Sequence, residues 1–181
     1  MEFNAKEQLP GLIEWMRQQM KACGGKTAVI GISGGKDSWI MAMLMKHLQP
    51  FSEVPYELEY LCMDPGYSPE NRRRIEENAA LLHIPITVFE TDIFDTVHTI
   101  DKSPCYLCAR MRRGFLYDKA QSLGCNKIAL GHHFDDVVET ILLSMLYGGE
   151  YKGMMPKLKS TNFEGMELIR PLYYVREEAI I

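Results

Sequence analysis

The sequence predicts an α/β fold in which a doubly wound, mostly parallel sheet carries helices on both faces. Short apolar runs rich in β-branched residues alternate with segments whose apolar residues recur at helical spacing. This alternation is typical of right-handed β-α-β units, which build parallel sheets. The length of 181 residues and the 46% share of hydrophobic residues suit one domain. Such sheets bind ligands at the carboxyl ends of their strands, so we expect the functional residues in the turns there.

The first half of the chain is expected to alternate three helices with three strands. Gly24-Gly25 ends the first helix, Pro50 follows the second, and Ser68-Pro69-Glu70 begins the third. The run 27–32 is apolar and β-branched, whereas 56–63 alternates between apolar and polar residues. The expected helices cover residues 5–23, 38–48 and 68–82, and the expected strands cover residues 27–32, 56–63 and 86–89.

The second half continues the pattern less regularly. Helices are expected over 105–123 and 134–147, and strands over 127–130 and 167–169. The last helix has an apolar side, made of Val137, Val138, Ile141, Leu142, Met145 and Leu146. Residues 174–181 have the pattern of a helix start, so we expect that a C-terminal portion is missing from this chain.

Composition excludes several classes of protein. A net charge of −4 and a pI near 5.8 exclude a generally basic nucleic-acid coat, although not a local basic patch. No apolar run approaches the roughly 20 residues of a membrane span, and the N-terminus lacks the layout of a signal peptide. Five cysteines, an odd number, argue against a disulfide framework. We therefore expect a cytoplasmic protein without a membrane partner.

The turn after the first strand is the strongest candidate site. It consists of Ser33-Gly34-Gly35-Lys36-Asp37-Ser38, between a strand and a helix. Adjacent glycines let backbone N–H groups point at a ligand, and the helix adds its positive N-terminal end. The two hydroxyls and Lys36 complete an anion cradle suited to phosphates, although a glycine turn that merely links strand and helix is the alternative.

This turn departs from two familiar nucleotide motifs. A Walker loop needs four residues between its glycines and Ser or Thr after the lysine, and a dinucleotide fingerprint needs Gly-x-Gly-x-x-Gly. Here three residues separate Gly31 from Gly35, and Asp37 follows Lys36. A carboxylate in a phosphate cradle repels phosphates unless Mg²⁺ lies between them. The sequence therefore predicts that Asp37 binds Mg²⁺.

A second polar turn follows the fourth strand. Gly131-His132-His133-Phe134-Asp135-Asp136 joins that strand to a helix. The two aspartates fall in the first helical turn, where the helix dipole favours negative charge, so helix capping is one interpretation. Adjacent histidines on a strand end point to opposite sides, which argues against a two-histidine metal site.

A cysteine pair with basic neighbours begins the helix expected at 105–123. Cys105 and Cys108 are spaced to chelate a metal or form a redox disulfide, or they are incidental thiols. The sequence offers no second pair to complete a zinc site. The basic residues Arg110, Arg112 and Arg113 predict a local positive face for an RNA backbone, or else a solvated helix face.

The Ser-Gly-Gly-Lys-Asp-Ser turn resembles the PP-loop signature of the ATP pyrophosphatases. That resemblance implies an adenine nucleotide alpha-hydrolase-like fold and ATP cleavage between the α and β phosphates. The turn at Gly131 resembles the Gly-His-(His/Asn)-x-Asp-Asp element of PP-loop tRNA thiolases. By this resemblance Ser33–Ser38 bind ATP, Gly131 and His132 line the nucleotide site, and Asp135 or Asp136 holds Mg²⁺ or orients the reacting groups.

The segment from Cys105 to Tyr117, with Tyr147-Gly148-Gly149, resembles the tRNA 2-thiocytidine synthetase group. In that group three cysteines hold a 4Fe-4S cluster with one iron open for sulfide. Two of the three match Cys105 and Cys108, and the third normally lies further along than this chain extends. The single cysteine within residues 1–25 separates the chain from related uridine thiolases with a zinc-binding N-terminus.

The resemblance implies an ATP-dependent tRNA thiolase that adenylates the C2 carbonyl of an anticodon-loop cytidine and replaces oxygen with sulfur. Its expected partners are tRNA, a sulfur donor (a cysteine desulfurase or sulfide) and a second copy of the chain. Residues 1–25 form an N-terminal helix and residues 26–181 the PP-loop domain. The alternatives are another PP-loop adenylating enzyme (a uridine thiolase, a lysidine-type ligase or an amidotransferase) and a non-catalytic nucleotide sensor.

Overall fold

The computed structural model describes residues 5–21, 28–52, 55–91, 93 and 104–180, with the backbone alone for residues 5–9, 12, 20, 28, 29 and 104–109. The helices are α1 (Ala5–Lys21), α2 (Lys36–Leu48), α3 (Pro69–Leu81), α5 (Pro104–Ser122) and α6 (Phe134–Gly148), with the short 3-10 helices η1 (Gln49–Phe51) and η2 (Glu177–Ala179). The strands are β1 (Ala28–Ile32), β2 (Leu58–Asp64), β3 (Ile86–Glu90), β4 (Lys127–Ala129), β5 (Lys157–Lys159) and β6 (Glu167–Ile169).

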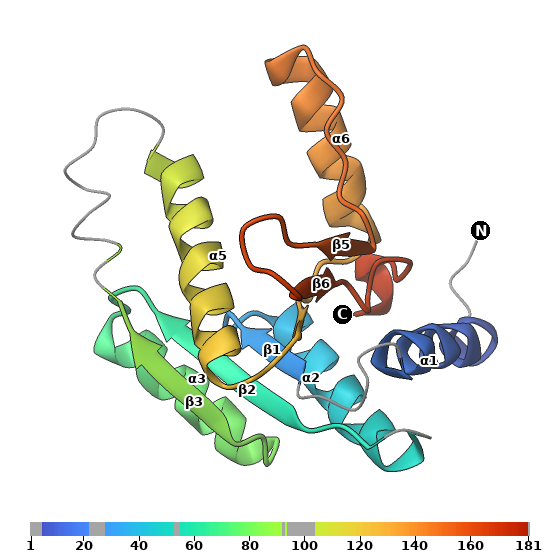
Figure 1. Cartoon of the computed structure of the whole chain (residues 1–181), viewed down its shortest axis with the longest axis vertical. Coiled ribbons are helices and arrows are strands. Elements are labelled where there is room, and N and C mark those ends of the chain that lie inside the picture. Colours follow the sequence, from blue (N-terminus) through green and yellow to red (C-terminus); the bar gives the residue numbers. More distant parts are fainter. Residues whose placement is uncertain (1–4, 22–27, 53–54, 92, 94–103, 181) are drawn as a thin grey trace.

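The described strands form one sheet in the order β3-β2-β1-β4-β6-β5 (Figure 1). Every pairing is parallel except that of β5 with β6. The predicted doubly wound, mostly parallel sheet is thereby confirmed. The chain winds from β1 outward to β2 and β3, then returns to place β4 on the other side of β1. Such a reversal opens a crevice at the carboxyl ends of the two central strands.

The sheet buries apolar side chains on both faces. Along β2, Tyr60 and Cys62 belong to the core that α2 and α3 cover, whereas Leu61 belongs to the core that α5 covers. Successive side chains of a strand point to opposite faces, so a continuous apolar run is what a sheet covered on both sides requires. This explains why the parallel strands could be predicted from short apolar runs.

Two helix starts bear directly on the site. Ser68 caps α3, accepting a hydrogen bond from the Asn71 backbone N–H at 3.3 Å, as its Ser-Pro-Glu sequence predicts. α2 begins at Lys36, two residues earlier than expected, because Gly35 is already its extended N-cap residue. Asp37 consequently lies inside the first turn of α2.

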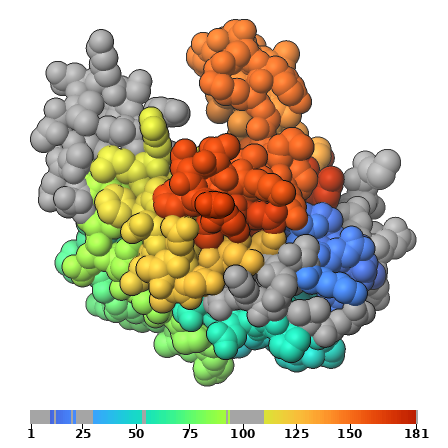
Figure 2. All heavy atoms as spheres, viewed as in Figure 1, coloured from blue at the N-terminus to red at the C-terminus, as the bar shows by residue number. Residues whose placement is uncertain are grey.

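The C-terminal third differs from the expectations in three ways. The apolar side of α6 is not buried: only Val137 among its described residues is buried, and the helix projects from the body (Figures 1 and 2). β5 was not expected, because Lys157-Leu158-Lys159 has no strand-like apolar pattern. The expected helix start at 174–181 is only the single 3-10 turn of η2. None of the described helices is both long enough and apolar enough to cross a lipid bilayer.

Candidate functional site: the crevice between β1 and β4

The turn after β1 depends on Gly34. Its φ of +88° is a conformation that side chains rarely adopt. A Cβ atom there would also lie 2.9 Å from Cγ1 of Ile75, which is on α3. Gly35 is the extended N-cap residue of α2 and has no side chain to cap the helix. The first N–H groups of α2 therefore face the carboxyl end of β1, where the crevice lies. The arrangement is that of an anion site at a helix N-terminus.

The two serines of the turn have different environments. Ser38 is buried, and its Oγ donates to the Gly35 carbonyl at 2.8 Å and accepts from the Ser33 N–H at 3.3 Å. Ser33 is exposed, and its Oγ accepts from the Gly35 N–H at 3.4 Å. Ser38 therefore holds the loop in shape, whereas the Ser33 hydroxyl remains accessible to a ligand.

Lys36 and Asp37 put opposite charges beside the loop. The Lys36 Nζ lies 2.8 Å from Oε1 of Glu177 and 3.2 Å from Oδ1 of Asp37. Glu177 first, and then Asp37, raise the pKa of Lys36, which stays protonated. Oδ1 of Asp37 is buried, and its contact with Lys36 lacks the geometry of a hydrogen bond. A buried carboxylate oxygen of this kind is a ligand that Mg²⁺ accepts.

The turn after β4 packs directly on the turn after β1. A Cβ atom on Gly131 would lie 2.9 Å from the carbonyl carbon and oxygen of Asp37 and 3.0 Å from the backbone nitrogen of Ser38. A glycine at 131 is therefore what allows this close approach. The structure thus brings together the two turns that the sequence singled out.

His132 lies at the carboxyl end of β4 and faces a pocket. Its Nδ1 is buried and has no hydrogen-bond partner among the described residues. Burial first, and then the charge of Arg170, lower the pKa of His132, so its imidazole is neutral at pH 7. His133 is buried, with Nδ1 3.8 Å from Oδ2 of Asp135. No cluster of three metal-binding side chains occurs among the residues that the structure describes.

Both aspartates of the second turn hold local structure. Oδ2 of Asp136 accepts the backbone N–H of His133 at 2.9 Å and so caps α6, in agreement with the capping interpretation. Oδ2 of Asp135 accepts the backbone N–H of Glu177 at 2.7 Å, and its Oδ1 lies 3.6 Å from Nε of Arg176. Asp135 therefore fixes the C-terminal segment that carries Glu177, the partner of Lys36.

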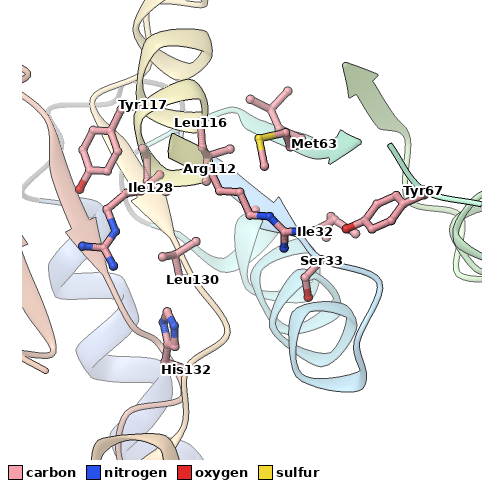
Figure 3. A pocket seen from close by; sticks show the side chains of 13 residues that line it. Ile32, Ser33, Met63, Tyr67, Arg112, Leu116, Tyr117, Ile128, Leu130 and His132 are labelled. Atoms are coloured by element: carbon pink, nitrogen blue, oxygen red, sulfur yellow. The ribbon is translucent and has the colours of Figure 1, made fainter. Parts of the chain in front are cut away.

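A pocket of about 260 Å³ opens beside these turns. The carboxyl ends of β1, β2 and β4 contribute mostly apolar walls, including Ile32, Met63 and Leu130 (Figure 3). Ser33 and His132 supply polar groups on the same wall. An apolar pocket with a few polar groups next to a phosphate cradle suits a nucleoside.

The three arginines predicted to bind tRNA do not share one surface. Arg112 and Arg113 line the pocket, and Figure 3 shows Arg112 reaching from α5 toward Ile32 and Ser33. Arg110 and Arg113 line a second depression, between α5 and β5. Adjacent residues of a helix point in different directions. Arg112 therefore lines the pocket, Arg110 lines the second depression, and Arg113 lines both.

Arg170 was missed by the sequence analysis. It follows β6, is 5% exposed, and donates from its guanidinium to the Met155 carbonyl. Its Nε has no hydrogen-bond partner among the described residues, and burial first, then Arg113, lower its pKa. The signal that could have found it is its place after a strand, at the edge where the other polar turns lie.

The cysteine pair lies in the first turn of α5. The backbone at residues 105 and 108 is helical. Their side chains lie outside the described residues, so the expected cluster is not tested. Cys62 and Cys125 are buried free thiols, and burial raises the pKa of each to about 11, which makes them poor metal ligands.

Several curated proteins similar to this chain carry the same name. The chain is 40% identical over 163 residues to the tRNA-cytidine(32) 2-sulfurtransferase of Neisseria meningitidis serogroup C, covering 87% of this chain and 50% of that protein. It is 42% identical over 165 residues to the enzyme of the same name from Alcanivorax borkumensis, covering 87% and 56%. The chain spans about half the length of the curated relatives that it matches.

Solved structures with the same fold include a tRNA thiolase and NAD synthetases. The U34-tRNA thiolase NcsA of Methanococcus maripaludis, solved with its 4Fe-4S cluster, superposes with a TM-score of 0.68 at 21% identity, covering 94% of this chain and 62% of that one. The NH3-dependent NAD synthetase of Campylobacter jejuni gives 0.65 at 16% identity, covering 99% and 71%. These likenesses show the fold.

A family model described as a PP-loop domain matches residues 11–181. That match includes both turns that meet in the crevice, the one after β1 with its strained glycine and the one after β4 that packs upon it. The chain belongs to the PP-loop domain family.

Proposed function

We propose that this chain is the ATP-binding part of a tRNA sulfurtransferase that converts an anticodon-loop cytidine to 2-thiocytidine. The observation that carries the proposal is the packing of Gly131 against Asp37, which puts both PP-loop turns around one pocket. The name of the curated relatives, tRNA-cytidine(32) 2-sulfurtransferase, gives the substrate class.

ATP binds with its phosphates on Ser33–Ser38 and its nucleoside in the adjoining pocket. The N–H groups at the start of α2 and the Ser33 hydroxyl contact phosphate oxygens. Asp37, whose buried Oδ1 fits Mg²⁺, would hold that ion, which would offset phosphate charge. Arg112 reaches toward Ser33 and adds a second positive charge where pyrophosphate leaves.

The chemistry needs two displacements. The C2 carbonyl oxygen of cytidine attacks the α-phosphorus of ATP, the bond to the β-phosphate oxygen breaks, and pyrophosphate leaves. Hydrosulfide then attacks C2, the C2–O bond breaks, AMP departs with the oxygen, and the sulfur proton goes to solvent. The protein's part is to align the carbonyl with ATP and to compensate charge. Neutral His132 lines the pocket and donates or accepts a hydrogen bond there.

Sulfur is delivered at Cys105 and Cys108. Two cysteines at this sequence spacing fit part of a cluster site, and a 4Fe-4S cluster with a third cysteine would supply an iron open to sulfide. Asp135 and Asp136 do not position the sulfur. They hold α6 and Glu177 in place beside the Ser33–Ser38 loop. The sulfur comes from a cysteine desulfurase or from sulfide. Anaerobic reconstitution of the full-length protein, followed by Mössbauer spectroscopy, tests the cluster, and zinc without iron in an active sample contradicts it.

The protein also works as a cytoplasmic homodimer in this proposal. Support for the dimer comes from α6, whose outer face exposes a row of large apolar side chains: Leu142, Leu143, Met145, Leu146 and Tyr147. A monomer seldom exposes a contiguous apolar surface of this kind.

One experiment tests the function directly. The full-length protein is incubated with ATP, a sulfide source and unmodified tRNA, and the digested nucleosides are analysed by mass spectrometry. We expect 2-thiocytidine together with stoichiometric AMP and pyrophosphate. Lysidine or 2-thiouridine would assign a different PP-loop enzyme, and ATP binding without pyrophosphate would indicate a sensor.

A further inference from the structure

A groove of about 690 Å³ runs between α5 and the β5–β6 hairpin. One wall carries Arg110 and Arg113, and the other carries Lys159 and the hairpin residues Ser160, Thr161 and Asn162. Figure 2 shows the two segments, yellow and red, side by side on this face. This hairpin is the element that the sequence analysis did not expect.

The cationic side chains that line the groove have no acidic partners among the described residues. No carboxylate lines it, and Arg110, Arg113 and Lys159 have no ion pair with any carboxylate among the residues that the structure describes. The basic run on α3 is different: Arg72, Arg73 and Arg74 each lie within 4 Å of an acidic side chain. Three cations without acidic partners along one depression indicate a polyanionic ligand.

The groove is preformed and also offers neutral hydrogen-bonding groups. The Phe163 ring stacks on Tyr117 of α5 with centroids 5.1 Å apart and planes at 25°, which joins the hairpin to the helix at the base of the groove. Ser160 Oγ accepts the Phe163 N–H at 3.1 Å and shapes the turn. Thr161 and Asn162 are exposed there and can bond phosphate oxygens and 2′-hydroxyls.

The groove joins the nucleotide pocket. Arg113 and Tyr117 line both depressions, so a chain lying in the groove is separated from the pocket by no more than these side chains. A base that reacts at C2 must leave its stack, which a single-stranded segment does at low cost. The groove volume is within the roughly 300–1,000 Å³ of small-ligand sites, too small for a duplex.

We propose that this groove binds the single-stranded RNA segment next to the target nucleotide, with backbone phosphates on Arg110, Arg113 and Lys159 and with the hairpin as a contact surface. The inference rests on the proposed function, since it gives the RNA a path to the same pocket. An acidic peptide would not need hydroxyl and amide donors beside the cations, so RNA is favoured.

The test uses the full-length protein with an R110A, K159A double variant, which leaves pocket-lining Arg113 in place. The probe is a fluorescent anticodon stem-loop, titrated at several salt concentrations. We expect weaker binding, and a salt slope that falls by up to about 0.7 per lost phosphate contact. The matched control is R73A, whose arginine already pairs with Glu77 at 3.5 Å and should leave slope and affinity unchanged. ATP affinity, measured separately, should be that of the wild type in both variants.

Three results would each overturn the proposal that the groove binds single-stranded RNA. The double variant could bind the RNA probe with unchanged affinity and salt slope, or a fully paired RNA hairpin could depend equally on Arg110 and Lys159. Polyglutamate of equal charge could also compete with the RNA probe for binding. The groove and the proposed function fail separately. RNA binding that depends on the groove, without 2-thiocytidine formation, leaves the groove standing and removes the function. If the double variant forms 2-thiocytidine as the wild type does, the proposed function stands and the groove is removed.

Discussion

Asp37 is the residue on which the proposed ATP site depends most. Its carboxylate stands in the proposed phosphate cradle, with Oδ1 buried and 3.2 Å from Nζ of Lys36. D37N removes the charge that would hold Mg²⁺ but keeps the shape. We expect pyrophosphate release with tRNA to fall about 100- to 1,000-fold, the size of a lost transition-state charge contact. D118N, an exposed site on α5, is the control. Release at the wild-type rate in D37N would remove Asp37 from the site.

Gly34 offers a stability test with a built-in comparison. G34A places a side chain at φ +88° and 2.9 Å from Ile75, whereas G124A places one at φ +73° with nothing within 4 Å. Both variants should lose about 1–2 kcal/mol through the left-handed backbone. G34A should lose about 1–3 kcal/mol more through overpacking, measured by urea denaturation. Equal losses in the two variants would mean that Ile75 moves aside freely.

At the scale of elements, a buried ion pair joins β4 to β6. Lys127 and Glu167 are register partners, with side chains 2% and 15% exposed, and Lys157 lies 3.1 Å from the same carboxylate. Burial works to raise the pKa of Glu167, but hydrogen bonds from Lys127 and Lys157 outweigh it and hold the pKa below its usual value. The pair thus fastens β4, the strand that positions His132, to β6.

K127M should cost roughly 3 kcal/mol of unfolding free energy, at the low end for a broken buried pair because Lys157 still compensates Glu167. The double variant K127M, E167L should recover most of this loss, since no buried charge is left alone. Urea denaturation of the three proteins measures both effects. A double variant as unstable as K127M would show that packing, not charge, is at stake.

At the scale of the whole molecule, acid should loosen the sheet. Burial tends to raise the pKa of Asp64, but the Tyr67 N–H and Arg72 outweigh it and leave the pKa below its ordinary value of 3.8. Arg72 also lies 3.2 Å from Glu90, so it links β2, α3 and β3. A lowered carboxyl pKa gives stability that is present above the unfolded value and lost as pH falls through the folded one.

Unfolding free energy should therefore fall as the pH drops below about 4. D64N, which cannot ionise, should be less stable at pH 7 and show a flatter acid dependence. Chemical denaturation from pH 7 to pH 3 compares the two. Parallel pH curves would mean that Asp64 titrates alike in the folded and unfolded chains.

Assembly is the second property of the whole molecule. Leu142 and Leu146 are 51% and 77% exposed on the projecting helix α6. The double variant L142S, L146S should keep the monomer's unfolding free energy to within about 1 kcal/mol, since surface positions contribute little. It should shift the full-length protein from dimer toward monomer in analytical ultracentrifugation. An unchanged dimer would place the interface elsewhere.

The sequence by itself determined the sheet's parallel strands and the turn that we propose binds phosphate. Strands buried on both faces are apolar throughout, and the cradle is six contiguous residues, so both are visible locally. Helix starts were predicted to within two residues where Ser68 or a glycine marks them. The family resemblance rested on the same contiguous motifs.

Only the tertiary structure decided what lies beside what. It brought Gly131 onto Asp37, gave Asp135 and Asp136 to helix and loop contacts, and put Arg112 in the pocket while Arg110 faces a groove. β5 was not predicted from the sequence because a three-residue edge strand with polar flanks forms only against its partner strand. The apolar side of α6 was typical of a core helix, but periodicity does not say whether a face is covered. Local patterns record which surface a segment could bury, whereas long-range packing decides which surface it does bury and which side chains thereby meet.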